Sequence, residues 1–170
     1  KILSIVNVVG SSIARESDVV LYTWAGPEIA VATTKAYSTQ LAVLDLLGLY
    51  FAQRLGTVQP EEYEQILQEM LVLPAKMEQV LENREDIQYY ASQYFNHDSV
   101  FYIGRNLDYA LGLEGSLKLK EISYIHSEAY ASGELKHGTI SLIEDGTLVV
   151  ALATYGQLFE KAMSNVVEVK

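Results

Sequence analysis

The chain contains no cysteine, only three prolines and far fewer basic than acidic residues. Without cysteine it can form no disulfide, no thiolate zinc site and no cysteine nucleophile, which fits a reducing compartment. Lys plus Arg is 12 against 22 for Asp plus Glu, a net charge of -10. Because no stretch clusters the basic residues, the composition argues against a nucleic-acid partner. A small anionic substrate remains compatible, since a few local donors suffice to bind it.

Long apolar runs are also missing. The most apolar stretch, Leu41–Ala52, is interrupted by Asp45 and Gly48. It is too short to span a bilayer, and no signal peptide is visible, so we expect no membrane partner. The chain has three histidines, His97, His126 and His137. Their spacing is not that of metal ligands, and we expect neither a metal nor a cofactor.

Hydrophobic residues at 49% and charged residues at 20% are typical of a globular protein. Short, nearly continuous apolar runs predict strands at Ile2–Val9, Val19–Trp24, Ser99–Ile103 and Thr147–Ala153. Runs of this kind are typical of strands buried on both faces of a parallel sheet. Because helical patterns separate them, the sequence predicts an α/β fold.

Helical patterns dominate the middle of the chain. We expect a long helix over Thr34–Leu55, ended by Gly56, and a second helix that starts at Pro60 and is broken by Pro74. Later helices are expected over Asp108–Ile122 and from Gly156 to the end, with a polar, glycine-containing stretch over Ser123–Gly138.

The pattern divides the chain into residues 1–56, a helical linker over 57–96, and residues 97–170. The chain begins without Met inside an apolar run and stops at Lys170 within a helical pattern. We therefore expect it to be a piece of a longer protein.

One acid–lysine–acid row could carry chemistry. On a helix, Glu114, Lys118 and Glu121 share one face within an arc of about 60°, at roughly 100° per residue. A carboxylate can remove a proton while the lysine stabilises a developing oxyanion. The same spacing is also typical of a surface helix supported by Glu–Lys pairs, and the pattern alone leaves both interpretations open.

Two polar segments are further candidates. His137 stands beside Gly138 in a polar stretch, and histidine suits proton transfer near neutral pH, although it could equally be a loop residue without a role. Thr33 and Thr34 lie between a strand and a long helix, where the helix N-terminus suits an anion. They could instead be simple N-caps.

Taken together, these segments resemble the sugar-isomerase half of the glutamine–fructose-6-phosphate aminotransferase (isomerizing) family. The matching stretches are Gly10–Ser12 with Arg15–Asp18, Glu28–Gln40, Leu113–His126 and Glu128–Gly138. Their order and spacing match from near Ser4 to near Lys170, and the helical middle, 57–99, matches least.

The resemblance implies the sugar isomerase (SIS) fold, a three-layer α/β/α sandwich with a five-stranded parallel sheet. That fold occurs twice in the isomerase half, and this chain would hold the later part of the first unit and the early part of the second. By position, Glu121 matches the base that moves a proton between sugar C1 and C2, and Lys118 its catalytic neighbour. His137 matches the ring-opening histidine supplied by the adjacent subunit. Val31, through its backbone, and Thr33 match substrate-binding positions.

The resemblance also implies a cytoplasmic homodimer that makes glucosamine 6-phosphate from fructose 6-phosphate and glutamine. The family's phosphate loop, C-terminal lysine tail and glutaminase domain have no counterpart in this sequence, so we expect the piece to be inactive alone. Two other functions stay open: a regulatory module that binds a sugar phosphate, and a deglycase or deaminase acting on amino-sugar phosphates. The joint presence of Glu121, Lys118 and His137 favours the enzyme, because a sensor does not need that set.

Overall fold

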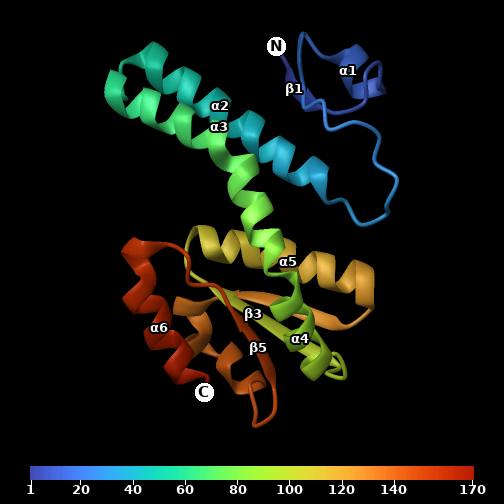
Figure 1. Ribbon diagram of the computed structural model, residues 1–170, viewed down its shortest axis with the longest axis vertical. Coiled ribbons are helices and arrows are strands. Elements are labelled where there is room, and N and C mark those ends of the chain that lie inside the picture. Colours follow the sequence, from blue (N-terminus) through green and yellow to red (C-terminus); the bar gives the residue numbers. More distant parts are fainter. The chain divides into compact units, whose positions relative to one another are not determined.

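A computed structural model describes residues 1–170 of the chain. The chain forms two compact units, Lys1–Asp86 and Ile87–Lys170, and each contains its own parallel sheet (Figure 1). The α/β class with parallel strands is confirmed. No helix is long and apolar enough to cross a membrane. The sequence-based boundaries at 56 and 96 stay predictions.

The first unit is a strand–helix–strand crossover followed by two long helices. Its elements are β1 (Leu3–Val6), α1 (Ser12–Glu16), β2 (Val19–Tyr22), α2 (Lys35–Leu55) and α3 (Pro60–Glu82). β1 and β2 pair in parallel with Leu3 opposite Val19. Ser11 caps the start of α1, because its hydroxyl accepts a hydrogen bond from the amide of Ala14 at 3.3 Å. Both strands are shorter than the apolar runs that predicted them.

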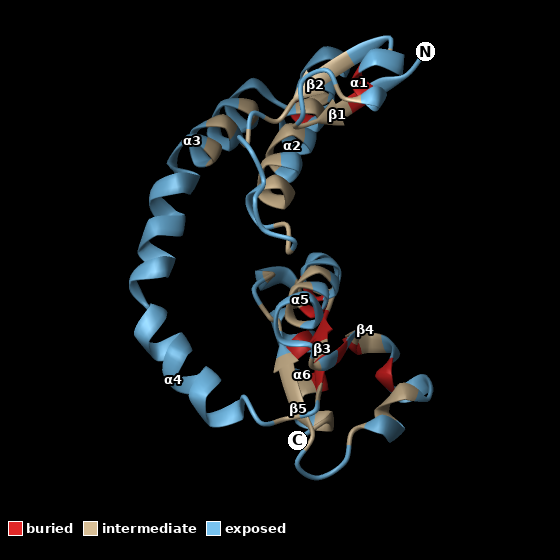
Figure 2. Cartoon of the chain, turned by 90° about the vertical axis from the view of Figure 1, so that its right-hand side faces the viewer, coloured by how far each residue is buried: buried red, intermediate tan, exposed pale blue.

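The two long helices confirm one boundary prediction and contradict another. Gly56 ends α2 in the left-handed region at φ 67°, where glycine carries no Cβ penalty. Pro74, in contrast, lies inside α3 and does not break it, so that prediction is wrong. Proline removes a single amide donor. Because α3 contains no buried residue, water can bind the carbonyl left without its partner (Figure 2).

The second unit holds a three-stranded parallel sheet. Its elements are α4 (Arg84–Tyr94, which begins just before the unit), β3 (Ser99–Gly104), α5 (Leu107–Ser123), β4 (His126–Ala131), η1 (Ser132–His137), η2 (Thr139–Leu142), β5 (Leu148–Ala151), η3 (Gly156–Leu158) and α6 (Phe159–Glu168). β3 is central, with Ser99 opposite His126 of β4 and Val100 opposite Leu148 of β5. Buried residues gather on β3 and around it (Figure 2).

Strand β4 lies within Ser123–Gly138, which the sequence predicted only as a polar stretch, so that prediction is wrong. The residues of this strand that contact α5, Ser127 and Ala129, are small because the helix packs closely on the sheet. Ser116 and Ser127 are both buried with their hydroxyls 2.8 Å apart. A Cβ added at Gly112 would lie 3.3 Å from Cδ1 of Leu152 and 3.9 Å from the Cβ of Ala129 on β4, so a larger residue at this contact would crowd the sheet.

A buried carboxylate joins the start of α5 to the end of β5. Asp108 accepts the amide of Thr154 at 2.9 Å, the hydroxyl of Thr154 at 2.5 Å and the amide of Tyr155 at 3.2 Å. These bonds fix the loop that leads into α6. α6 ends at Glu168, two residues before the predicted end of the helix.

Candidate active site

The predicted acid–lysine–acid row is present on α5. Nζ of Lys118 lies 2.5 Å from Oε2 of Glu121 and 3.7 Å from Oε1 of Glu114. All three side chains are between 20% and 30% exposed. Ser116 faces the sheet, and Lys118 follows it by about 200° around the helix, so the row lies on the outer face of α5.

The electrostatics of the row keep its lysine charged. The hydrogen bond that Lys118 donates to Glu121 raises the pKa of Lys118, and the charges of Glu121 and Glu114 raise it further against the opposing effect of desolvation. At neutral pH the row is therefore a cation flanked by two acidic side chains. Such a group can stabilise an oxyanion at Lys118 and move a proton at a carboxylate.

His137 is at the end of η1, and its side chain is 76% exposed. Its nearest charged partner is Glu134, with Nε2 3.8 Å from Oε2. No ion pair joins His137 to Glu121, which pairs with Lys118 instead. The imidazole therefore faces solvent, where a group from outside its own helix could reach it.

Val31 and Thr33 belong to the first unit, in the loop between β2 and α2. Val31 is 96% exposed, and Thr33 is partly buried. The amine of Lys35 donates to the carbonyl of Pro27 at 2.6 Å, so the start of α2 is tied back to the beginning of this loop. Thr34 stands at the N-cap position of α2, but its side chain makes no capping bond. The interpretation of the threonines as simple caps is thus not supported at Thr34.

The residue that secures this loop was not predicted from the sequence. The side chain of Asn7, just after β1, donates to the carbonyl of Gly26 at 2.7 Å. It accepts the amide of Ala25 at 2.9 Å and the hydroxyl of Thr23 at 3.1 Å. A single asparagine after a strand is a weak signal, because its partners lie at least 16 residues away.

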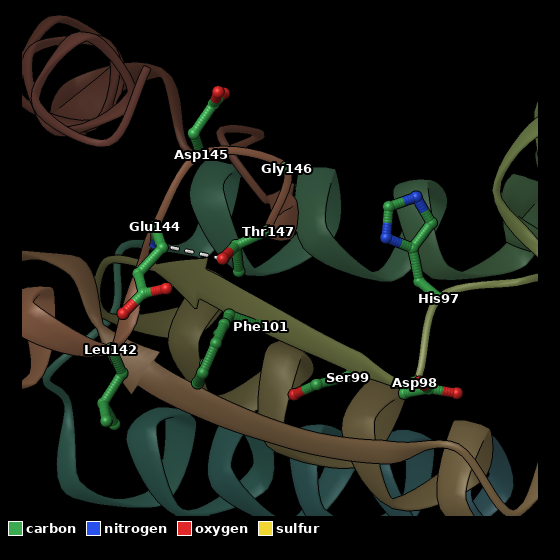
Figure 3. Close-up of a pocket in the computed structure, with 9 residues that line it drawn as sticks. All are labelled: His97, Asp98, Ser99, Phe101, Leu142, Glu144, Asp145, Gly146 and Thr147. Atoms are coloured by element: carbon green, nitrogen blue, oxygen red, sulfur yellow. Dashed lines mark hydrogen bonds between the residues drawn. The ribbon is translucent and has the colours of Figure 1, made fainter.

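A separate hollow of about 350 Å³ lies at the amino ends of β3 and β5 (Figure 3). Asp98, Glu144 and Asp145 line it together with His97. The amide of Glu144 donates to the hydroxyl of Thr147 at 3.0 Å. Three acids would repel a phosphate, and ligands of open parallel sheets bind at the carboxyl ends of strands. None of the predicted site residues lies there.

The SIS domain family matches residues 1–50 and 93–170. The chain therefore belongs to the SIS domain family, whose fold was expected from the sequence. Individual proteins to which it is highly similar share one enzyme name. The chain is 60% identical over 170 residues to the glutamine--fructose-6-phosphate aminotransferase [isomerizing] of Caldanaerobacter subterraneus subsp. tengcongensis. It is 57% identical over 169 residues to the protein of that name from Clostridium acetobutylicum.

These matches cover 100% and 99% of the chain but only 28% of the length of each relative. A solved structure, the C-terminal domain of glucosamine-fructose-6-phosphate aminotransferase from Francisella tularensis, superposes with a TM-score of 0.94 at 38% identity. That match covers 98% of this chain and 47% of the other. The resemblance predicted from the sequence is confirmed.

Proposed function

We propose that this chain forms part of the isomerase half of an enzyme that makes glucosamine 6-phosphate from fructose 6-phosphate and glutamine. The observation that carries the proposal is the row of Glu114, Lys118 and Glu121 on the outer face of α5. It occurs in a chain whose similarity to the aminotransferases extends over its whole length. Aldose–ketose chemistry needs a base between two carbons and a cation beside the developing oxyanion, and the row offers both.

Glu121 is the proposed base. It takes the proton from C1 of the sugar, and it returns a proton to C2 as the double bond moves. Oε2 of Glu121 is held by Lys118, whereas Oε1 makes no hydrogen bond and is the oxygen that can reach the substrate. Lys118 keeps the carboxylate oriented and stabilises the negative charge that develops on the sugar oxygen.

His137 is the proposed acid–base group at the sugar ring. Opening the ring breaks the bond between C2 and O5, gives O5 a proton and removes one from the C2 hydroxyl. The exposed imidazole suits a role toward the site of a second subunit in a homodimer. Val31 and Thr33 are the proposed substrate-binding positions in the first unit, and we assign the enzyme to the cytoplasm.

The full-length protein that contains this chain tests the proposal. Incubated with fructose 6-phosphate, it should form glucosamine 6-phosphate, detected by mass spectrometry, only when glutamine is present. A deaminase or deglycase would instead consume glucosamine 6-phosphate without glutamine. Binding of the sugar phosphate without turnover would identify a regulatory module. Either of those results would overturn the proposal.

A further inference from the structure

The short helix η1 is fixed by its buried residues rather than by its histidine. Leu135 is fully buried, and Ser132 is nearly so. His137, at the end of the same helix, makes no hydrogen bond and lies 3.8 Å from Glu134. Because the imidazole has no hydrogen bond of its own, the backbone of η1 decides where this residue is placed.

The start of η1 rests on Arg105. A Cβ added at Gly133 would lie 3.2 Å from both Nη1 and Nη2 of Arg105, so the guanidinium lies against the backbone of Gly133. Arg105 directly follows β3, the central strand of the sheet. It thus joins η1 to the most buried strand of the unit.

A network of hydrogen bonds that starts at the same arginine, Arg105, holds the end of η1. Nε of Arg105 donates to Oδ1 of Asn165 at 2.9 Å, and Nδ2 of Asn165 donates to Oε2 of Glu168 at 3.0 Å. Oε1 of Glu168 lies 2.7 Å from Nζ of Lys136, the residue before His137. The network therefore contacts η1 at two places, at Gly133 through Arg105 and at Lys136 through Glu168.

Burial and charge both favour a persistent network. Asn165 is only 6% exposed, and its amide is satisfied by Arg105 and Glu168. The hydrogen bond from Lys136 lowers the pKa of Glu168, and the hydrogen bond from Asn165 adds to this effect. Asn165 and Glu168, whose side chain is 22% exposed, form the inner part of the network, and Lys136, at 64% exposed, forms its outer link.

We propose that Arg105 is a positioning residue for His137, acting through Asn165, Glu168 and Lys136 to hold η1 in place. This inference rests on the proposed function, in which His137 opens the sugar ring. It assigns Arg105 no contact with the substrate. The requirement is geometric, because an acid–base group displaced by about 1 Å can cost about 100-fold in rate.

A substrate without a ring separates positioning from general stability. 5-Deoxyfructose 6-phosphate lacks the C5 hydroxyl, so it cannot form the furanose that fructose 6-phosphate adopts. Its turnover needs Glu121 and Lys118 but no ring opening. A residue that acts through His137 should matter for the cyclic sugar alone.

The experiment compares Arg105→Met with Lys161→Met in the full-length protein, using both sugar phosphates and glutamine. Lys161 is an exposed cation of α6 without an ion pair, so it serves as the matched control. For Arg105→Met we expect turnover of fructose 6-phosphate to fall about 10- to 100-fold. Turnover of the acyclic sugar should stay within about 2-fold of the unchanged enzyme, as should both activities of Lys161→Met. Adding His137→Ala to Arg105→Met should cause little further loss on the cyclic sugar, because both changes affect one step.

Equal losses on the two substrates, or independent losses in the double variant, would overturn the inference and leave the proposed function intact. Failure of the unchanged enzyme to convert either sugar would overturn the proposed function and the inference with it. If Arg105→Met does not fold, Arg105→Lys keeps the charge and should show the same dependence on substrate. Failure of both variants to fold would assign Arg105 to the fold and reject a positioning role.

Discussion

Nζ of Lys118 and Oε2 of Glu121 lie 2.5 Å apart on α5, less than one helical turn from each other along the chain. The contact fixes the carboxylate in one orientation and leaves Oε1 without a partner. It also raises the pKa of Lys118, so the cation persists at neutral pH. In the proposed mechanism this pair supplies both the base, Glu121, and the charge that stabilises the oxyanion, Lys118.

Replacing Glu121, the proposed base, should strongly slow isomerisation without disturbing the helix. Glu121→Gln keeps the shape of the side chain and can still accept a hydrogen bond from Lys118. In the full-length enzyme we expect formation of glucosamine 6-phosphate to fall by about 100-fold or more, a typical loss for a general base. Hydrolysis of glutamine should continue.

Lys120→Gln is the matched control, because Lys120 is an exposed neighbour on the same helix that makes no ion pair. Its activity should stay within about 2-fold of the unchanged enzyme. A coupled assay in which Glu121→Gln forms product at the normal rate would rule out Glu121 as the base.

Mixing two inactive subunits tests whether His137 serves a neighbouring site. A Glu121→Gln subunit retains His137, and a His137→Ala subunit retains Glu121. If the site is shared, a heterodimer contains one intact site, so an equal mixture should recover about a quarter of the normal activity. Native mass spectrometry would measure the heterodimer. Heterodimers that form without any recovery would place both residues in a site within one chain.

Apolar patterning and glycine chemistry account for the part of the fold that the sequence predicted. Strand β3 is buried on both faces and reads as a continuous apolar run, and Gly56 ends α2 through its positive φ. Strand β4 was missed because packing against Gly112 and Ser116 selects small and polar residues there. When the helix packed against a strand determines the residues of that strand, the strand's own sequence shows little β-propensity or apolar patterning.

The candidate site, like the fold, could be predicted from the sequence only in part. The row on α5 was predictable, because helical spacing alone brings Glu114, Lys118 and Glu121 onto one face. The support of η1 was not, because Arg105 and Asn165 are 60 residues apart and only the tertiary fold brings them together. The role of Asn7 could not be predicted for the same reason, because its partners lie at least 16 residues away.

The link between α5 and β5 should depend on Asp108. Asp108→Ala would leave the buried amides of Thr154 and Tyr155 without their acceptor, at a cost of about 1–3 kcal/mol for an unsatisfied group. We expect hydrogen exchange at these two amides to become much faster, while exchange in β3 changes less. Asp108→Asn keeps an acceptor oxygen and should show a smaller effect. Unchanged exchange in Asp108→Ala would mean that the loop is held by other contacts.

Alkaline titration should reveal one unusually weak acid on β4. The hydrogen bond between the phenol of Tyr130 and Glu128, with burial as a second cause, raises the pKa of Tyr130 from 10.0 to about 12. The folded state therefore keeps a proton that the unfolded state loses, and the resulting stabilisation is complete below about pH 10 and lost as the pH rises toward 12.

In a tyrosinate absorbance titration, Tyr130→Phe should remove one late-titrating phenol, and Glu128→Gln should shift that phenol to lower pH. The stability advantage of the unchanged protein over Tyr130→Phe should shrink between pH 10 and 12. A titration curve of Tyr130→Phe that lacks only an ordinary phenol near pH 10 would contradict the assignment.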